Sequence, residues 1–263
     1  MTLPTVDNIV TIAGLQIETR IIGDFTPQKP VLIFLHEGLG CIALWQDFPG
    51  LLCERLGLAG LVYSRAGYGG SSPCPLPRPL DYMEREAEDV LPQLIEHFGI
   101  SRFILVGHSD GASIALIYSG SGELPPPEAV IAMAPHVFCE DISIEGITAA
   151  KIAYETGHLK WKLERFHGIN IEYAFRGWSD AWLNPRFRKW SIEKFLPAIT
   201  APILVIQGRN DRFGTTAQIE ATENSVAGPF EKLLLNDCGH NPWHEKPDDV
   251  LSKIETFITR HMQ

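Results

Sequence analysis

Residues 103–111, Phe-Ile-Leu-Val-Gly-His-Ser-Asp-Gly, decide the fold of this chain. The apolar run 103–106 predicts a buried strand, and the stretch 112–118 that follows the motif is compatible with a helix. Gly107 and Gly111 flank Ser109, and a strand that turns sharply into a helix needs glycines there because a side chain would clash. This Gly-x-Ser-x-Gly motif predicts a nucleophile elbow with Ser109 at its tip.

A nucleophilic serine needs a base that takes its proton and a carboxylate that orients the base. The apolar strand 203–206 leads to Asp211, and a later strand near 232–235 leads to His240 in a Gly-His-x-Pro context. We therefore expect Ser109, Asp211 and His240 to form a catalytic triad, because both partners follow strand ends in the required chain order. Glu140 and Asp141, which follow the strand 129–134, remain the alternative acids.

Two further motifs make the chain resemble the α/β-hydrolase superfamily over nearly its whole length. Residues 35–40, Leu-His-Glu-Gly-Leu-Gly, resemble the His-Gly oxyanion loop, and residues 64–71, Ser-Arg-Ala-Gly-Tyr-Gly-Gly-Ser, resemble the Asp-x-Arg-Gly-x-Gly-x-Ser turn. The resemblance implies an α/β-hydrolase fold, with a mostly parallel eight-stranded sheet flanked by helices and a helical cap inserted into it. It also implies an oxyanion hole made by the backbone N–H groups of Gly38 and Asp110, with Leu39 as the alternative donor.

The oxyanion loop departs from the family pattern at Glu37, where relatives carry glycine, and the second motif departs at Ser64 and Ala66. A free carboxylate beside the loop would oppose the negative charge that develops there. We hypothesise that Arg65, at the end of the neighbouring strand, pairs with Glu37 and holds the loop. The alternative is a Glu37 side chain that points into solvent.

The remaining pattern predicts the order of the elements. Alternating stretches at 9–12 and 15–21 predict a hairpin. Strands at 31–35, 61–63 and 103–106, separated by helices near 45–56 and 81–98, alternate as βαβ units, which implies a mostly parallel sheet. We assign residues 1–135 and 200–263 to an α/β-hydrolase core and 136–199 to the helical cap.

The region assigned to the cap is amphipathic and rich in aromatic residues, and it holds four of the six tryptophans. Because relatives carry a cap at this point, the resemblance implies that the region builds and gates the substrate pocket. His108, inside the elbow, is expected to pack away from the base. The residues expected to line the pocket are Glu37, Leu39, His136, Trp178, Trp182 and Trp243.

Composition limits the partners and the compartment. The formal charge, 22 − 32 = −10, argues against nucleic acid and anionic membranes as partners, because both carry phosphate. Five cysteines and an N-terminal stretch without signal-peptide character favour a cytoplasmic protein, and no apolar run approaches the roughly 20 residues that span a bilayer. A homodimer is compatible with the sequence.

The predicted activity is hydrolysis of a small carboxylic ester or thioester through an acyl-serine. C–C bond hydrolysis of a β-diketone-like substrate with the same triad is the alternative, and a non-catalytic ligand-binding protein is the alternative of another class. No metal and no organic cofactor are expected. Cys238, His240 and His244 would lack a fourth zinc ligand, and phosphate-loop and dinucleotide fingerprints are missing.

Overall fold

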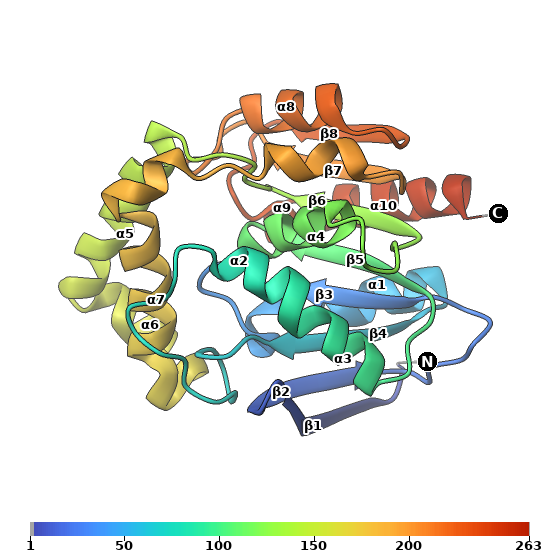
Figure 1. Ribbon diagram of the computed structural model, residues 1–263, viewed down its shortest axis with the longest axis horizontal. Coiled ribbons are helices and arrows are strands. Elements are labelled where there is room, and N and C mark those ends of the chain that lie inside the picture. Colours follow the sequence, from blue (N-terminus) through green and yellow to red (C-terminus); the bar gives the residue numbers. More distant parts are fainter. Residues whose placement is uncertain (1–2, 263) are drawn as a thin grey trace.

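The computed structural model describes residues 3–262, which are built around one eight-stranded sheet (Figure 1). Strand β2 runs antiparallel to both of its neighbours, and every pair from β4 across to β8 is parallel. The predicted mostly parallel sheet is therefore confirmed. In sheet order the strands are β1 (Thr5–Ile12), β2 (Leu15–Ile22), β4 (Ala59–Ser64), β3 (Val31–Leu35), β5 (Phe103–His108), β6 (Ala129–Met133), β7 (Ile203–Gly208) and β8 (Phe230–Leu235).

Each central strand buries both of its faces, and its side chains alternate between two hydrophobic cores. In β5, Phe103 and Leu105 lie in one core while Ile104 and Val106 lie in the other, as the two-residue period of a strand requires. The first core packs under α2 (Tyr82–Arg85), α3 (Leu91–His97), α4 (Asp110–Gly120) and α8 (Ala217–Ser225), and the second under α1 (Phe48–Leu56), α9 (Pro242–Glu245) and α10 (Pro247–His261).

Two helices differ from their predicted form. The helix expected near 45–56 is a 3-10 turn, η1 (Ile42–Trp45), followed by α1, and the chain breaks between them at Gln46, whose φ is 52°. The helix expected near 81–98 is divided into α2, a π-helical turn η2 (Glu86–Val90) and α3. Pro92 lies in the first turn of α3, where its missing N–H interrupts the regular α-helical bonding.

A helical segment connects β6 to β7 and gathers at one end of the sheet (Figure 1). Its last turn, η5 (Glu193–Ala198), packs so closely against α4 that a side chain at Gly120 would overlap Phe195. Of the helices in residues 3–262, none is both long and apolar enough to cross a membrane. The segment contains α5 (Asp141–Glu155), α6 (His158–His167), η3 (Gly168–Asn170), α7 (Ile171–Trp182), η4 (Pro185–Lys189) and η5 (Glu193–Ala198).

The turn between β5 and α4 is as tight as the two glycines predicted. Ser109 has φ 53° and ψ −119°, a backbone conformation that is strained for a residue with a side chain. A Cβ at Gly111 would overlap the carbonyl group of Leu35 at the end of β3, and one at Gly107 would overlap Gly111. The elbow is therefore pressed directly against the neighbouring strand end.

Replacing Gly111 by alanine should destabilise the protein severely, because the colliding atoms are backbone and cannot move aside. We expect Gly111→Ala to lower the free energy of unfolding by more than about 3 kcal/mol, measured as a shift of the urea midpoint. Gly50→Ala is the matched control, since a Cβ at this position in α1 meets nothing within 4 Å. The control should be neutral or slightly stabilising, by up to about 1 kcal/mol. Equal effects of the two changes would contradict this account of the elbow.

Candidate active site

Ser109, His240 and Asp211 form one hydrogen-bonded chain. The distance from His240 Nε2 to Ser109 Oγ is 2.9 Å, and the distances from His240 Nδ1 to the two carboxylate oxygens of Asp211 are 2.9 and 2.8 Å. Ser109 is 6% exposed and lies at the tip of the elbow. With Nδ1–H donating to the carboxylate, Nε2 is free to accept the serine proton, which is the arrangement that general-base activation of a hydroxyl requires.

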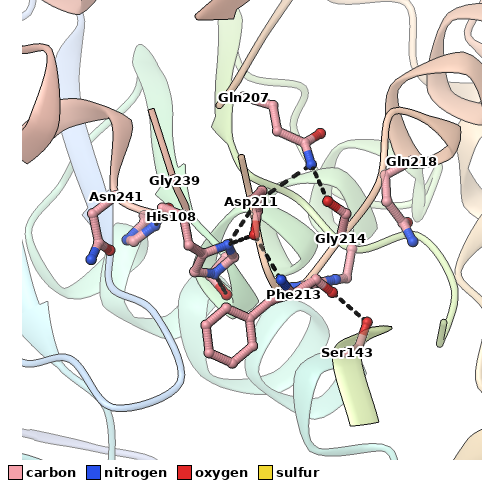
Figure 2. Close-up of polar contacts among 12 residues, drawn as sticks. His108, Ser143, Gln207, Asp211, Phe213, Gly214, Gln218, Gly239 and Asn241 are labelled. Atoms are coloured by element: carbon pink, nitrogen blue, oxygen red, sulfur yellow. Dashed lines mark hydrogen bonds and ion pairs between the residues drawn. The ribbon is translucent and has the colours of Figure 1, made fainter. Parts of the chain in front are cut away.

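The loop after β7 places hydrogen-bond donors around the Asp211 carboxylate (Figure 2). The Phe213 N–H donates to Asp211 Oδ1 at 2.8 Å, and Gln207 Nε2 lies 3.4 Å from Oδ2 while donating to the Gly214 carbonyl. Burial alone would raise the pKa of Asp211, but the adjacent His240 and the Phe213 N–H outweigh it, so the pKa lies below its ordinary value. The carboxylate is therefore available to orient and stabilise a histidine cation.

The alternative acids lie elsewhere. Glu140 accepts hydrogen bonds from Thr215 and from Gln218 Nε2, so its carboxylate fastens the start of α5 to the loop after Asp211. Asp141 is exposed and bonds to Arg188. Of the three carboxylates considered from the sequence, only Asp211 contacts His240.

The two expected oxyanion donors have free N–H groups. Among residues 3–262, neither the Gly38 N–H nor the Asp110 N–H donates a hydrogen bond. The indole of Trp178 lies over Gly38, because a Cβ there would overlap it. Leu39, the alternative donor, is tied down through its carbonyl, which accepts from His167 Nε2 at 3.0 Å. Free backbone N–H groups are the kind of donor that an oxyanion requires.

Arg65 holds the oxyanion loop, but through the backbone. Its guanidinium donates to the carbonyl oxygens of His36 and Glu37, and its own N–H donates to His36 Nε2 at 3.1 Å. No hydrogen bond or ion pair joins Arg65 to the Glu37 carboxylate within the described residues. The hypothesis that the Arg65 and Glu37 side chains pair is therefore wrong. The guanidinium bonds to the two backbone carbonyls instead of the carboxylate.

The Glu37 carboxylate instead faces His108, with Oε2 3.6 Å from Nδ1. Burial would raise the pKa of Glu37, but the adjacent His108, a backbone N–H group and the Arg65 charge together outweigh burial, so the pKa lies below its ordinary value. His108 Nε2 donates to the His240 carbonyl at 2.7 Å, and the Trp243 indole donates to His108 Nδ1 at 3.3 Å. His108 points away from Ser109 as the strand period predicts, yet it anchors the backbone of His240.

The expected pocket residues separate into two groups. His136 is buried between rings of the site, with its centroid 5.7 Å from that of His240 and 5.0 Å from that of Trp182. Trp178 covers Gly38, and Leu39 is part of the same loop. Trp243 instead packs in the second core, 5.2 Å from the Trp45 ring, and contacts the site through His108. The structure does not bring Trp243 to Ser109.

Three contacts that support the site were missed from the sequence. The Phe213 ring lies 4.8 Å from the His240 ring, and Ser143 of α5 donates to the Phe213 carbonyl (Figure 2). The Asp110 carboxylate, behind the elbow, accepts from the hydroxyl of Tyr82. No sequence signal marks these residues, because their roles depend on which segments meet in space.

No three histidine, cysteine, aspartate or glutamate side chains in residues 3–262 are grouped as metal ligands would be. Both ring nitrogens of His240 are engaged by Ser109 and Asp211. The site therefore consists of protein groups suited to proton transfer and nucleophilic attack.

Comparison with known proteins identifies the family. Residues 32–253 match the model of the alpha/beta hydrolase family. The chain is 22% identical to a proline iminopeptidase of Lactobacillus helveticus over 94% of this chain and 96% of the relative. It also superposes on the esterase of Exiguobacterium antarcticum, with TM-score 0.76, 17% identity and 97% and 100% of the two chains covered.

The enol-lactonase of Burkholderia xenovorans superposes similarly, with TM-score 0.74, 18% identity and 96% and 100% of the two chains covered. At these identities the structural matches establish the shared fold. The family model covers most of the chain. The chain belongs to the alpha/beta hydrolase family.

Proposed function

We propose that this hydrolase cleaves a small carboxylic ester or thioester through an acyl-serine intermediate. The observation that carries the proposal is the unbroken hydrogen-bonded chain from Ser109 Oγ through His240 to Asp211. A serine hydroxyl at a strained elbow, bonded to an oriented imidazole, has the geometry of an activated nucleophile.

The proposed reaction proceeds in two halves. His240 Nε2 removes the Ser109 proton as Oγ attacks the carbonyl carbon, and the N–H groups of Gly38 and Asp110 bind the resulting oxyanion. The intermediate collapses as His240 passes the proton to the leaving oxygen or sulfur, which leaves an acyl-serine. Water, deprotonated by His240, then attacks the acyl group and restores Ser109. Asp211 stabilises the imidazolium in both halves.

The closeness of the aromatic side chains favours a small substrate. Ser109 is almost buried, the Trp178 ring lies over Gly38, and His136 and Phe213 flank His240. A bulky acyl chain would need the helical segment to move. C–C bond hydrolysis of a β-diketone-like substrate uses the same groups and remains the alternative.

A prolyl amide is the second candidate. It is favoured by the proline iminopeptidase relative and by the ionised Glu37 carboxylate beside the oxyanion loop, which would attract a protonated amine. Turnover of proline 4-nitroanilide, with no turnover of acetyl, butanoyl and thioacetyl esters, would favour the peptidase.

The first test labels the nucleophile without a known substrate. A fluorophosphonate probe should add once to the wild-type protein and not to Ser109→Ala, as measured by intact mass. On any ester that is cleaved, Ser109→Ala should lower kcat by at least about 10³-fold, because the three groups act as a unit. Ser119→Ala is the control, since this serine of the same helix bonds to the Ala115 carbonyl and not to the site. An unlabelled wild-type protein would favour the non-catalytic ligand-binding alternative.

The second test concerns the acid and the pH dependence. Because the pKa of Asp211 is held below its ordinary value, the carboxylate stays charged while a histidine base titrates. The rate should fall with decreasing pH as the base takes a proton, and Asp211→Asn should lower kcat by about 10³- to 10⁴-fold at every pH. Glu140→Gln, which alters the neighbouring carboxylate, should keep most of kcat. A larger loss in Glu140→Gln than in Asp211→Asn would reassign the acid.

The third test separates the loop backbone from the Glu37 side chain. Arg65→Lys should lower kcat more than it raises KM, because an ammonium cannot bond to both loop carbonyls in the geometry of the guanidinium. In a double-mutant cycle with Glu37→Gln the coupling energy in kcat/KM should stay below about 1 kcal/mol, because the guanidinium bonds to the Glu37 carbonyl and not to its carboxylate. A coupling energy above about 1 kcal/mol would restore a direct Arg65–Glu37 pair.

A further inference from the structure

One buried polar group beside Ser109 and His240 has no task in the reaction described above. The imidazole of His136 is 3% exposed, and Nδ1 is sealed from solvent without a hydrogen-bond partner in residues 3–262. Nε2 also has no partner in these residues, but it keeps some solvent-accessible surface. A buried imidazole left unbonded is costly, so a missing partner at the accessible nitrogen is expected.

The surroundings fix the orientation of the ring. Two hydrogen bonds hold the His136 backbone: its N–H donates to Ser113 Oγ, and Ser113 Oγ donates to its carbonyl. The edge with Cε1 and Nδ1 faces Gly214, where a Cβ would lie 3.4 and 3.5 Å from these atoms. The Trp182 and His240 rings flank the imidazole at 5.0 and 5.7 Å. The ring is therefore held in one position next to the base.

The same environment assigns the tautomer and the charge. An orphaned N–H is rarer in proteins than an orphaned acceptor, so the proton belongs on the accessible Nε2 and the sealed Nδ1 carries the lone pair. Burial, followed by the neighbouring His240, lowers the pKa of His136 to about 3, although the Asp211 charge acts in the opposite direction. His136 thus presents one uncharged N–H donor.

We infer that His136 is a specificity residue whose Nε2–H donates to an uncharged oxygen on the third carbon of the acyl group, as in a 3-hydroxyacyl or 3-oxoacyl ester. This inference rests on the proposed function. A C1–C2–C3–O chain reaches about 3.5 Å beyond the scissile carbon, given bonds of about 1.5 Å. The His136 ring lies 5.7 Å, between centroids, from that of His240, whose Nε2 bonds to Ser109 Oγ. A substrate carboxylate is disfavoured beside His136, because the negative charge of the nearby Asp211 would repel it.

The test compares two acyl groups that differ only in the oxygen. We would measure kcat/KM for the 4-nitrophenyl esters of each 3-hydroxybutanoate enantiomer and of 3-methylbutanoate, each divided by its rate with hydroxide. The wild-type protein should prefer one hydroxy ester by about fivefold to tenfold, the value of one hydrogen bond, and His136→Phe should reduce this ratio to about one. His136→Gln, which keeps an N–H donor, should retain part of the preference, and His97→Phe, on the exposed end of α3, should retain all of it.

A ratio removes any general loss of activity, so a merely structural role of His136 would leave it unchanged. A wild-type protein without the preference, or an equal preference in a folded His136→Phe, would overturn the inference. If His136→Phe does not fold, the same ratio in His136→Gln decides: a partial loss supports the inference, and an unchanged ratio overturns it.

A binding measurement separates this inference from the proposed function. Ser109→Ala would be titrated with methyl 3-hydroxybutanoate and methyl 3-methylbutanoate, with tryptophan fluorescence as the signal because Trp182 contacts His136. The hydroxy ester should bind about fivefold more tightly, and adding His136→Phe should abolish the difference. This preference without fluorophosphonate labelling of the wild-type protein would refute the hydrolase and keep the inference. Labelling without the preference would refute the inference alone.

Discussion

The contact on which the site depends is the one between Gly111 and the carbonyl group of Leu35. It leaves no space for a side chain, so the first turn of α4 packs directly against the end of β3. Leu35 is also the first residue of the segment 35–40 that contains Gly38, and Ser109 lies two residues before Gly111. One close approach of two backbones therefore brings Ser109 and the free N–H groups of Gly38 and Asp110 to the same edge of the sheet. Hydrogen bonds from His240 to Ser109 and Asp211 then join the remaining residues of the site.

Site residues that directly follow the end of a strand could be predicted from the sequence. The alternation of apolar residues identified the strands, and the motif at 107–111, with Asp211 and His240 after later strands, identified the three residues that the structure joins by hydrogen bonds. Carboxyl ends of parallel strands meet at one edge, so local patterns predict a meeting in space. Their spacing in the chain, 29 residues from Asp211 to His240 and 131 from His240 to Ser109, is irrelevant to that convergence.

Sequence reasoning was less successful where the partner is a backbone atom. Arg65 was expected to bind a carboxylate, but it binds the carbonyls of His36 and Glu37, and His108 was expected only to pack, but it bonds to the carbonyl of His240. Every residue offers a carbonyl, so residue types carry no signal for such bonds. The break at Gln46 was missed for a similar reason, because a positive φ at a non-glycine residue is imposed by its tertiary surroundings.

The helical segment between β6 and β7 contacts the site at two separate points. Trp178 of α7 covers Gly38, whereas Ser143 of α5 bonds to Phe213, whose N–H in turn bonds to Asp211. Any displacement of this segment that opened the space above Gly38 would therefore also strain the hydrogen bonds that orient His240. Because a triad loses most of its advantage when one member is misplaced, the closed arrangement of aromatic side chains is also the one in which the base is best ordered. Under the proposed function, substrate access and an ordered base are therefore opposed, which is a further argument for substrates small enough to enter without moving α5.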